Sequence, residues 1–315
     1  MKIFVAGASG ALGRQLVPQL VAAGHSVVGM TRSRSKGDSL SELGAQPVVA
    51  DALDRDEVMR VVDAAEPDVI VHELTAIPAR LDTRRLDREF ALTNRLRTEG
   101  TDHLLAAARA AGTRRFVAQS YGGWPYEHRD DAIKTEGDPL DPDPLPSFRG
   151  ILDAIRHLEG AVLGAEGIEG IVLRYGSFYG PGTSLGAEPD GSVTEMVRKR
   201  RFPVVGSGAG VWSFIHVEDA AAATVAAVNG GPSGIYNIVD DDPARVADWL
   251  PFLAEAIGAK PPRRVPRWLG RLAAGEAATE MMTEICGASN AKAKRELAWQ
   301  LRYPSWRQGF TEGLG

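Results

Sequence analysis

Three glycines near the amino terminus have the spacing of a phosphate-binding turn. Gly7, Gly10 and Gly13 form G-x-x-G-x-x-G directly after the apolar segment KIFVA and at the start of a helical pattern. A tight turn there needs glycine's conformational freedom, and the helix offers unpaired N–H groups and a positive dipole end to a pyrophosphate. A flexible turn is the alternative, but a second strand ending near Met30 favours a dinucleotide site. We expect the cofactor to contact Gly7, Ser9, Gly10, Ala11, Leu12 and Gly13.

A basic segment, TRSRSKG, follows the second expected strand. Thr31, Arg32 and Ser33 supply hydroxyls and a cation where the 2′-phosphate of NADP would lie, and a carboxylate at that place would repel the phosphate. The alternative is a basic loop that is simply solvated. We predict that the cofactor is NADP(H).

Strand-like and helix-like segments alternate through the first half of the chain. Short segments rich in β-branched residues, such as HSVVGM and DVIVHEL, are bounded by turn residues, and apolar residues recur at helical spacing between them. Strict alternation predicts a parallel sheet covered on both faces. We expect an α/β fold, a Rossmann-type doubly wound parallel sheet with a smaller C-terminal substrate-binding subdomain. The expected dinucleotide-binding domain is 1–175 plus 213–240, and the subdomain is 176–212 plus 241–315.

The composition and charge of the chain argue against several classes of binding partner. The 315-residue chain has a net charge of −5, which gives no general attraction to nucleic acid or to an acidic membrane. Its longest apolar run, after Asp219, is shorter than the ~18 residues that a membrane span needs. The single cysteine, Cys286, has no partner for an internal disulfide, and the histidines are scattered. We interpret Asp242 and Pro243 as a helix start rather than part of a metal site. We expect a cytoplasmic monomer or homodimer that binds a small-molecule substrate and no metal, nucleic acid or membrane.

The order of the motifs resembles the short-chain dehydrogenase/reductase superfamily, in its extended, atypical branch of NAD-dependent epimerase/dehydratase-like proteins, over nearly the whole chain. GASGALG fits the nucleotide loop, DVIVHELTA the fourth strand, RFVAQS the fifth strand and LRYGSFYGPGT the loop after the sixth. The resemblance implies that Asp51 hydrogen-bonds the adenine, that Ser120 is the catalytic hydroxyl and that the last of these loops touches the nicotinamide. It adds further expected cofactor-binding residues, namely Asp51, Ala52, Leu74, Thr75 and Ala76.

The chain departs from this family on the helix GILDAIRHLEGAVLG. The family's proton donor is a Tyr-x-x-x-Lys pair, in which the tyrosine protonates the substrate oxygen and the lysine lowers the tyrosine pKa. Aligning Glu159 with the usual helix places Ile151 and Ile155 at these positions. Ile151, Ile155, Leu158 and Val162 form an apolar stripe at helical spacing, which predicts a buried packing helix. The usual pair is absent.

Trp212 is a second departure, because sugar-nucleotide enzymes of this branch place an arginine there for the substrate's diphosphate. Its flat apolar ring has a single N–H donor, so we expect an aromatic or apolar substrate instead. Other hydroxyls must then replace the missing donor, and the expected catalytic residues are Ser120, Tyr121 and Tyr175. Core packing is the alternative for each aromatic residue. The expected substrate pocket consists of Glu73, Tyr126, Phe178, Tyr179 and Trp212.

These features predict an NADP(H)-dependent oxidoreductase that reduces a small, apolar or aromatic carbonyl or enone with a non-standard proton donor. Two alternatives remain open. One is a non-redox isomerase, cyclase or lyase on the same scaffold, and the other is a non-enzymatic NADPH-binding regulator, for which a degenerate pair would be expected. The aromatic lining expected for the pocket favours an enzyme.

Overall fold

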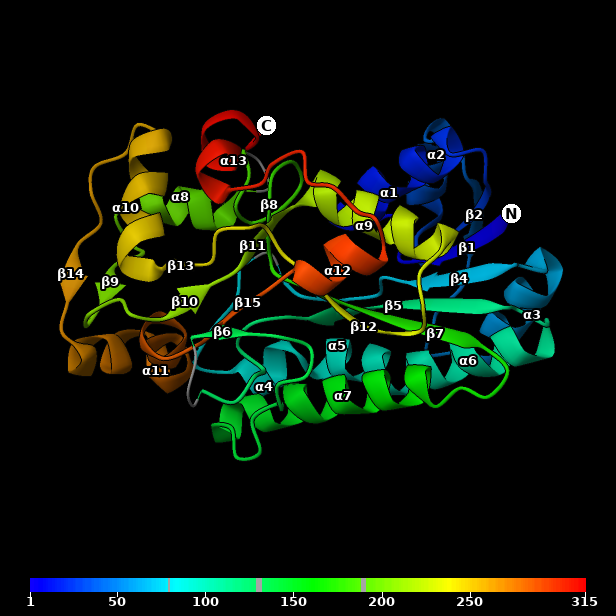
Figure 1. Cartoon of the computed structure of the whole chain (residues 1–315), viewed down its shortest axis with the longest axis horizontal. Coiled ribbons are helices and arrows are strands. Elements are labelled where there is room, and N and C mark those ends of the chain that lie inside the picture. The colour runs from blue at the N-terminus through cyan, green and yellow to red at the C-terminus, as the bar shows by residue number, and fades with distance from the viewer. Residues whose placement is uncertain (79, 129–131, 188–190) are drawn as a thin grey trace.

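A sheet of seven parallel strands forms the centre of the molecule (Figure 1). This computed structural model describes residues 1–78, 80–128, 132–187 and 191–315. The strands follow the order β12–β7–β5–β4–β1–β2–β3, and each neighbouring pair is parallel. Their bounds are β1 Lys2–Ala6, β2 Ser26–Thr31, β3 Gln46–Val49, β4 Val69–His72, β5 Arg115–Tyr121, β7 Glu169–Tyr175 and β12 Gly234–Ile238. The Rossmann-type α/β fold expected from the alternating pattern is confirmed.

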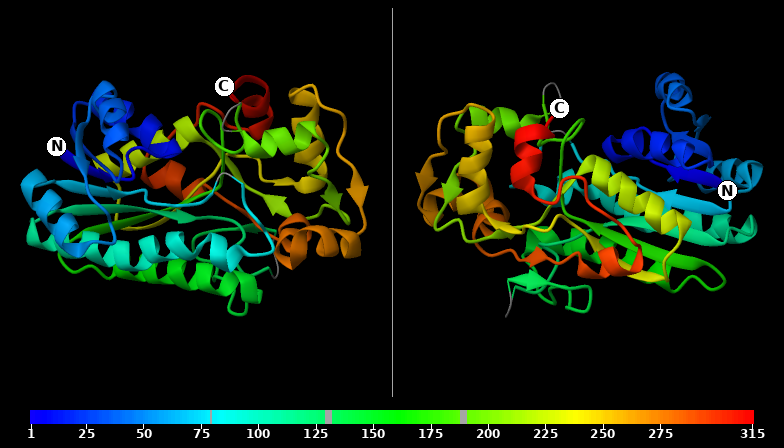
Figure 2. Two further views of the ribbon diagram at one scale, coloured as in Figure 1. Left: turned by 180° about the vertical axis from the view of Figure 1, so that it is seen from behind. Right: turned by 45° about the horizontal axis from the view of Figure 1, so that its top comes forward.

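Helices cover both faces of this sheet, so its strands can be almost continuously apolar. One face packs against α1 and α9 through residues such as Val5 and Val71, and the other packs against α3, α6 and α7 through residues such as Phe4 and Ile70. The alternation of side chains along β1 and β4 therefore divides the core into two layers. Figure 2 shows the helices above and below the sheet. These covering helices are α1 Ala11–Ala22, α3 Arg55–Ala65, α6 Thr101–Ala110, α7 Pro146–Leu163 and α9 Val217–Asn229.

The strand order reverses between β1 and β4. The chain runs outward from β1 through β2 to β3, and then returns to the middle of the sheet at β4. In open parallel sheets, ligands bind at the carboxyl ends of the strands beside such a reversal. This edge brings together the glycine loop after β1, the basic segment after β2 and the residues that follow β4, β5 and β7.

Most elements beyond residue 176 build a second packed region, on the left of Figure 1. Its buried residues include Tyr179, Val204, Phe214, Trp249 and Trp306, which come from segments far apart in the sequence. The elements of this part are β8 Ser177–Tyr179, α8 Ser192–Arg198, β9 Val204–Val205, β10 Val211–Trp212, β11 Phe214–His216, β13 Ala244–Arg245, α10 Val246–Ala256, β14 Arg264–Val265, α11 Arg267–Thr283 and α13 Trp306–Glu312. The remaining elements are η1 Arg34–Lys36, α2 Gly37–Glu42, α4 Leu86–Glu89, α5 Ala91–Arg95, η2 Leu96–Gly100, β6 Ile133–Lys134, β15 Gly287–Ala288 and α12 Ala291–Glu296. The division of the chain into two domains at the stated boundaries stays a prediction.

The expected helix start at Asp242 and Pro243 is wrong. The helix α10 begins three residues after Pro243, with Arg245 as its N-cap, and the intervening strand β13 pairs with β10. The Asp242 carboxylate instead accepts a hydrogen bond from Ser305 Oγ (2.7 Å) and pairs with Arg307. Partners more than sixty positions away along the chain thus take the place of a local cap.

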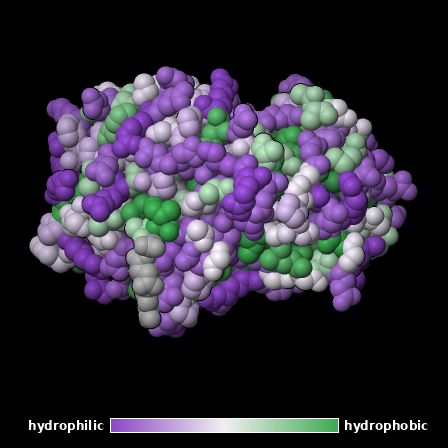
Figure 3. Space-filling view, viewed as in Figure 1, coloured by the Kyte–Doolittle hydropathy of each residue, from purple (hydrophilic) through white to green (hydrophobic). Residues whose placement is uncertain are grey.

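Two kinds of feature are missing from the part of the chain that the structure describes. No helix there has the length and apolar character needed to cross a membrane, and no group of three or more histidine, cysteine, aspartate or glutamate side chains could hold a metal ion. The face of the molecule seen in Figure 3 is mostly hydrophilic, with small hydrophobic patches between polar regions.

Candidate active site

The glycine loop makes a tight turn between β1 and α1. Gly7 has a φ of +96°, and a Cβ there would lie 2.7 Å from the carbonyl oxygen of Glu73. A Cβ at Gly13 would lie 2.3 Å from the carbonyl oxygen of Ala8. Both positions therefore require glycine, the first for its backbone conformation and for space, and the second for close packing of α1 on the loop.

The first turn of α1 can bind an anion. Gly10 is the N-cap and makes no side-chain hydrogen bond to the helix, and the first turn contains no acidic residue. The leading N–H groups of a helix have no partner within the helix, and its dipole places positive potential at this end. The loop and helix thus fit the pyrophosphate of a dinucleotide.

A series of hydroxyl groups connects this loop with the end of β2. Ser9 Oγ lies 3.2 Å from Thr31 Oγ1, which accepts a hydrogen bond from the Ser33 N–H (3.3 Å). Arg32 is exposed next to them. An open hollow of about 440 Å³ adjoins this segment and is lined by Arg34, Ser35, Gly37, Asp38, Pro47 and Val49. The hydroxyls and cations of this segment fit a phosphate on the adenosine half of a cofactor.

The other expected cofactor residues lie in the connections that follow β3 and β4. Asp51 is half-buried, and its Oδ1 accepts the Leu53 N–H (3.0 Å). Glu73 extends the pairing of β4 with β1, because its N–H donates to the Ala6 carbonyl (2.8 Å). This hydrogen bond draws the chain after β4 against the glycine loop. The residues concerned are Asp51 and Ala52 after β3, and Leu74, Thr75 and Ala76 after β4.

A buried charged network surrounds the hydroxyl expected at the end of β5. Ser120 is 1% exposed and donates to Glu159 Oε1 (2.7 Å) on α7. The Arg174 guanidinium donates to both Glu159 oxygens (2.8 and 2.6 Å) and to the Tyr126 hydroxyl (2.9 Å). Burial lowers the pKa of Arg174, but the hydrogen bonds and charge of Glu159 outweigh burial and the net shift is upward. The Ser120 proton is therefore held by a carboxylate that is itself fully paired.

Tyr175 lies on the opposite face of the sheet from Ser120. Its hydroxyl is 2.6 Å from Thr224 Oγ1 on α9 and donates to Glu73 Oε1 (3.3 Å). Burial raises the pKa of Glu73 well above its usual value, although the Tyr175 hydrogen bond lowers it in part. Ser120 and Tyr175 thus bond to different helices, α7 and α9, across the sheet, and the catalytic roles expected for Ser120, Tyr121 and Tyr175 stay predictions.

Tyr121 adjoins the helix positions where an ionisable pair would lie. With Trp124 it packs against a buried cluster of Leu86, Phe148, Ile151, Ile155 and Ala277. Ile151 and Ile155 are 2% and 1% exposed, so the expected packing role of this stripe is confirmed. The rings of Trp124 and Phe148 stack with centroids 4.6 Å apart. The Tyr121 hydroxyl pairs with Ser177 Oγ (3.0 Å), and burial raises the pKa of Tyr121.

Two residues expected to line a substrate pocket lie in the packed interior instead. Tyr126 and Tyr179 are both 0% exposed. The Tyr126 hydroxyl donates to Asn237 Oδ1 (2.7 Å), and the Tyr179 ring packs edge-on against Phe310, with centroids 5.3 Å apart. Residues more than a hundred positions away contact both side chains, and the pocket role expected for Tyr126 and Tyr179 stays a prediction.

The other three expected pocket residues differ in accessibility. Phe178 and Trp212 are half-buried, whereas Glu73 is 6% exposed and its Oε2 has no hydrogen-bond partner within residues 1–78, 80–128, 132–187 and 191–315. The Trp212 Nε1–H donates to the Met281 carbonyl (2.8 Å), so this ring has no free donor for a diphosphate. The Phe178 ring lies 5.3 Å from that of Tyr175.

Sequence reasoning missed several polar residues at this edge. Glu159 and Arg174 lie within apolar patterns of α7 and β7, and charges in such patterns could have signalled a buried ion pair. Asn94 and Arg97 have buried side-chain atoms to which no described residue forms a hydrogen bond. Nothing in the segment LTNRLRTEG distinguishes Arg97 from the exposed Arg95.

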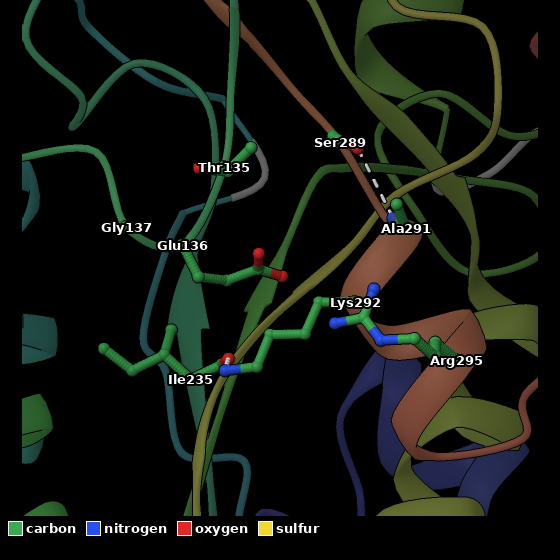
Figure 4. A pocket seen from close by; sticks show the side chains of 8 residues that line it. All are labelled: Thr135, Glu136, Gly137, Ile235, Ser289, Ala291, Lys292 and Arg295. Atoms are coloured by element: carbon green, nitrogen blue, oxygen red, sulfur yellow. Dashed lines mark hydrogen bonds between the residues drawn. The ribbon is translucent and has the colours of Figure 1, made fainter.

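A second hollow lies beside β12, at the free edge of the sheet (Figure 4). Lys292 Nζ donates to the Ile235 carbonyl (2.8 Å), and Glu136 Oε1 accepts the Asn237 N–H (2.7 Å). These side chains satisfy backbone groups of the edge strand and so protect it from pairing with another chain. The hollow has a volume of about 450 Å³ and is lined by Thr135, Glu136, Gly137, Ile235, Ser289, Ala291, Lys292 and Arg295. None of these residues belongs to the expected cofactor or catalytic set.

The fold and the geometry of this edge are those of a dinucleotide-binding enzyme, and comparison with known proteins gives the family. The sequence pattern of the NAD dependent epimerase/dehydratase family matches residues 3–239, so the chain belongs to this family. A 3-diazoavenalumate denitrifying reductase from a Streptomyces species is 43% identical over 311 residues, which cover 98% of this chain and 99% of that protein. A 4-hydroxy-2-methyl-3-oxo-4-farnesyl-3,4-dihydroquinoline-1-oxide ketoreductase from Stigmatella aurantiaca is 32% identical over 272 residues, which cover 82% of this chain and 74% of that protein.

Solved structures share the fold over the full length of the chain. The UDP-glucose 4-epimerase of Thermotoga maritima, with UDP-glucose, has a TM-score of 0.77 at 22% identity and covers 100% of this chain and 97% of its own. The UDP-glucose 4-epimerase of Thermus thermophilus, in complex with NAD, has a TM-score of 0.75 at 22% identity and covers 100% and 98%. Together with the two reductases, the family identifies the chain as an NAD(P)-dependent oxidoreductase of the extended short-chain dehydrogenase/reductase type.

Proposed function

We propose that the protein is an NADP(H)-dependent reductase of a diazo-substituted aromatic compound, in which hydride replaces dinitrogen on the ring. The observation behind this proposal is the buried apolar cluster around Ile151 and Ile155, which leaves α7 without a proton donor at either position. Reduction of a carbonyl needs a hydride and a proton, whereas reduction of an aryl diazonium group needs a hydride alone. The substrate class is supported by the relative that is 43% identical over 98% of the chain and is named a denitrifying reductase of a diazo compound.

The net reaction balances without an acid. NADPH supplies one hydride with its electron pair and leaves as NADP⁺. The aryl diazonium cation accepts that hydride, its carbon–nitrogen bond breaks with the electron pair leaving on nitrogen, and the arene and N₂ are released. Because no proton is consumed, the protein has to bind and orient the ring and to exclude water. The aromatic wall of Tyr121, Trp124 and Phe148 suits these tasks.

The preference for NADP(H) is part of the proposal. It is supported by the exposed Arg32, by the hydroxyl series of Ser9, Thr31 and Ser33, and by the lack of an acidic residue in TRSRSKG. A solved relative binds NAD, but it is only 22% identical to this chain. The choice between the two cofactors therefore depends on the segment after β2.

We also propose the domain division, the location and the oligomeric state expected from the sequence. The segments 1–175 and 213–240 bind the cofactor, and 176–212 and 241–315 form the substrate-binding subdomain. The protein works on a small-molecule substrate as a monomer or homodimer in the cytoplasm, where cells regenerate NADPH.

Reduction of an aromatic ketone or enone is the second candidate. It is supported by the relative named a ketoreductase, which is 32% identical over 82% of the chain. In this reaction Tyr121 would give its proton to the substrate oxygen, and Ser177, whose Oγ lies 3.0 Å from the tyrosine hydroxyl, would orient it. The two candidates thus differ in their need for Tyr121.

Isotope transfer distinguishes the candidates. We expect that one of the two stereospecifically 4-deuterated forms of NADPH delivers deuterium to the ring carbon of an o-hydroxyaryl diazonium salt. One N₂ should form per NADPH oxidised, well above the rate without protein. Tyr121→Phe should leave this rate nearly unchanged, whereas ketone reduction through Tyr121 would slow by about 10²–10⁴-fold. Deuterium transfer to ketones alone would favour the second candidate, and transfer to neither class would refute both.

A further inference from the structure

One buried cation at the catalytic edge has no counter-charge of its own. Arg97 is 4% exposed and lies in the π-helical turn η2, and its Nη1 has no hydrogen-bond partner among the residues that the structure describes. Burial lowers the pKa of Arg97 to about 10, which still leaves the guanidinium charged at neutral pH. A buried charge that lacks a partner is strongly unfavourable, and π-helical turns occur often at functional sites.

Two contacts locate this turn beside the apolar stripe of α7. A Cβ at Gly150 would lie 3.7 Å from Asn94 Nδ2. Seven residues further along α7, His157 Nε2 lies 2.9 Å from Asp102 Oδ1. The segment from residue 94 to 102 therefore runs alongside residues 150–157. Arg97 lies along the chain between these two contacts, in the turn η2, which packs against α7.

The carboxylate that attracts Arg97 is already paired. Glu159 attracts Arg97 electrostatically, but both of its oxygens accept hydrogen bonds from Arg174, at 2.8 and 2.6 Å, and one also accepts the Ser120 hydroxyl. The other electrostatic neighbour is the hydroxyl of Tyr121, which burial holds in its neutral form. The Arg97 guanidinium thus keeps an N–H donor, at Nη1, that pairs with no described residue, and has Tyr121 of the aromatic wall as an electrostatic neighbour.

Asn94 adds a second unpaired group to the same helical face. It precedes Arg97 by three residues, and its buried Oδ1 has no hydrogen-bond partner in the described part of the chain. An asparagine amide can present either its oxygen or its NH₂ group to a ligand, since the two differ by a flip of the side chain. A cation and an amide side by side match an ionised oxygen that needs more than one donor.

We propose that Arg97, together with Asn94, binds an anionic oxygen of the aromatic substrate, either a ring phenolate or a side-chain carboxylate. This inference deepens the proposed function, because it adds the substrate's charge to its aromatic ring. The anion neutralises the buried guanidinium, and the ring then lies against Tyr121 and the stacked Trp124. Arg97 is a specificity-determining residue in this arrangement and takes no part in hydride transfer.

Binding of unreactive probes tests the proposal without any turnover, so its outcome is independent of the reaction. The four probes, measured by calorimetry with saturating NADP⁺, are 4-hydroxycinnamate, 4-methoxycinnamate, 4-hydroxycinnamyl alcohol and 4-methoxycinnamyl alcohol. The native protein should bind 4-hydroxycinnamate more tightly than the last probe, which has no acidic group. Arg97→Met should weaken 4-hydroxycinnamate by about 10–150-fold, the effect of losing a charged hydrogen bond, and leave the last probe unchanged. The second probe keeps only the carboxylate and the third keeps only the phenol. Arg97→Met should weaken binding of whichever of these two probes carries the oxygen that Arg97 binds, and should leave the other unchanged.

Two controls separate recognition from folding. Arg95→Met removes an exposed arginine on the same helical segment, paired with Glu99 at 2.7 Å, and should change no affinity. Arg97→Met should melt at the same temperature as the native protein or higher, because it removes an unpaired buried charge, and Arg97→Lys should retain part of the anion preference. The proposal is overturned if the native protein does not prefer the anionic probe, or if Arg97→Met weakens all four probes alike. It is also overturned if Arg97→Met weakens NADP⁺ as much as the anionic probe.

Discussion

Replacing Ile155 by smaller residues should lower stability and leave the chemistry intact. Ile155 is 1% exposed and packs in a cluster with Phe148 and Ile151, so truncation removes apolar contacts and leaves a cavity. Substitutions of this kind cost about 0.5–1.5 kcal/mol for Ile→Val and about 2–5 kcal/mol for Ile→Ala. Leu158, one turn further on α7 and also 1% exposed, packs against the sheet and is the matched control. Leu158→Ala should cost about 2–5 kcal/mol as well.

Urea unfolding and steady-state kinetics measure the two effects separately. The urea concentration at the unfolding midpoint should fall slightly in Ile155→Val and further in Ile155→Ala, and the dependence of the unfolding free energy on urea should not change. For both variants and for Leu158→Ala, kcat per folded molecule should stay near the native value. A loss of kcat of about 100-fold in Ile155→Val, with an unfolding free energy within about 0.5 kcal/mol of native, would show that this position acts in the reaction and that our interpretation of the stripe is mistaken.

Three further predictions concern the cofactor, the substrate class and pH. Arg32→Ala should weaken NADPH and leave NADH affinity unchanged in calorimetry, because only the 2′-phosphate needs the cation; equal losses for both cofactors would contradict this role. UDP-glucose should not raise the melting temperature with NADP⁺ present, since the Trp212 N–H already donates to Met281; saturable stabilisation at micromolar concentration would count against an aromatic substrate. Burial lowers the pKa of His72 from 6.5 to about 4, so the unfolded chain binds this proton at a higher pH than the folded chain. The contribution of His72 to stability should therefore fall as pH falls from 6.5 to about 4. Burial raises the pKa of Glu73, so the folded chain holds that proton more tightly and the contribution of Glu73 to stability should fall as pH rises above 4.5, opposite in sign to that of His72. Urea unfolding at several pH values tests both contributions: relative to the native protein, His72→Gln should make stability fall more steeply with rising pH between 4.5 and 6.5, and Glu73→Gln should make it fall less steeply or rise.

Local patterns predicted the fold and the nucleotide loop because their causes are local. Gly7 needs a positive φ at a fixed place after β1, and the strand and helix periods are set by neighbours within a few residues. The apolar stripe with Ile151 and Ile155 could also be recognised from the sequence, because an isoleucine side chain cannot ionise and apolar residues at helical spacing face the core.

The sequence could not predict which hydroxyls lie together. Ser120 and Tyr175 both lie near the ends of adjacent strands, but the first bonds to α7 and the second to α9. A one-residue difference in strand position reverses the face of a side chain, and the bonding partners lie tens of residues away along the chain. For the same reason Tyr126 and Tyr179, which the sequence suggests for a pocket, are enclosed in the core.

The amino-acid sequence by itself determined the doubly wound sheet, the glycine turn, the basic segment after β2 and the apolar stripe of α7 at Ile151 and Ile155. These features depend on backbone conformation, hydrophobic period and residue type, all of which are written over short stretches of chain. Only the tertiary structure decided that Glu159 is saturated by Arg174 and Ser120, and that Arg97 is left buried without a partner beside the aromatic wall. Whether a buried charge is paired depends on side chains brought together from distant segments, and no local pattern records that.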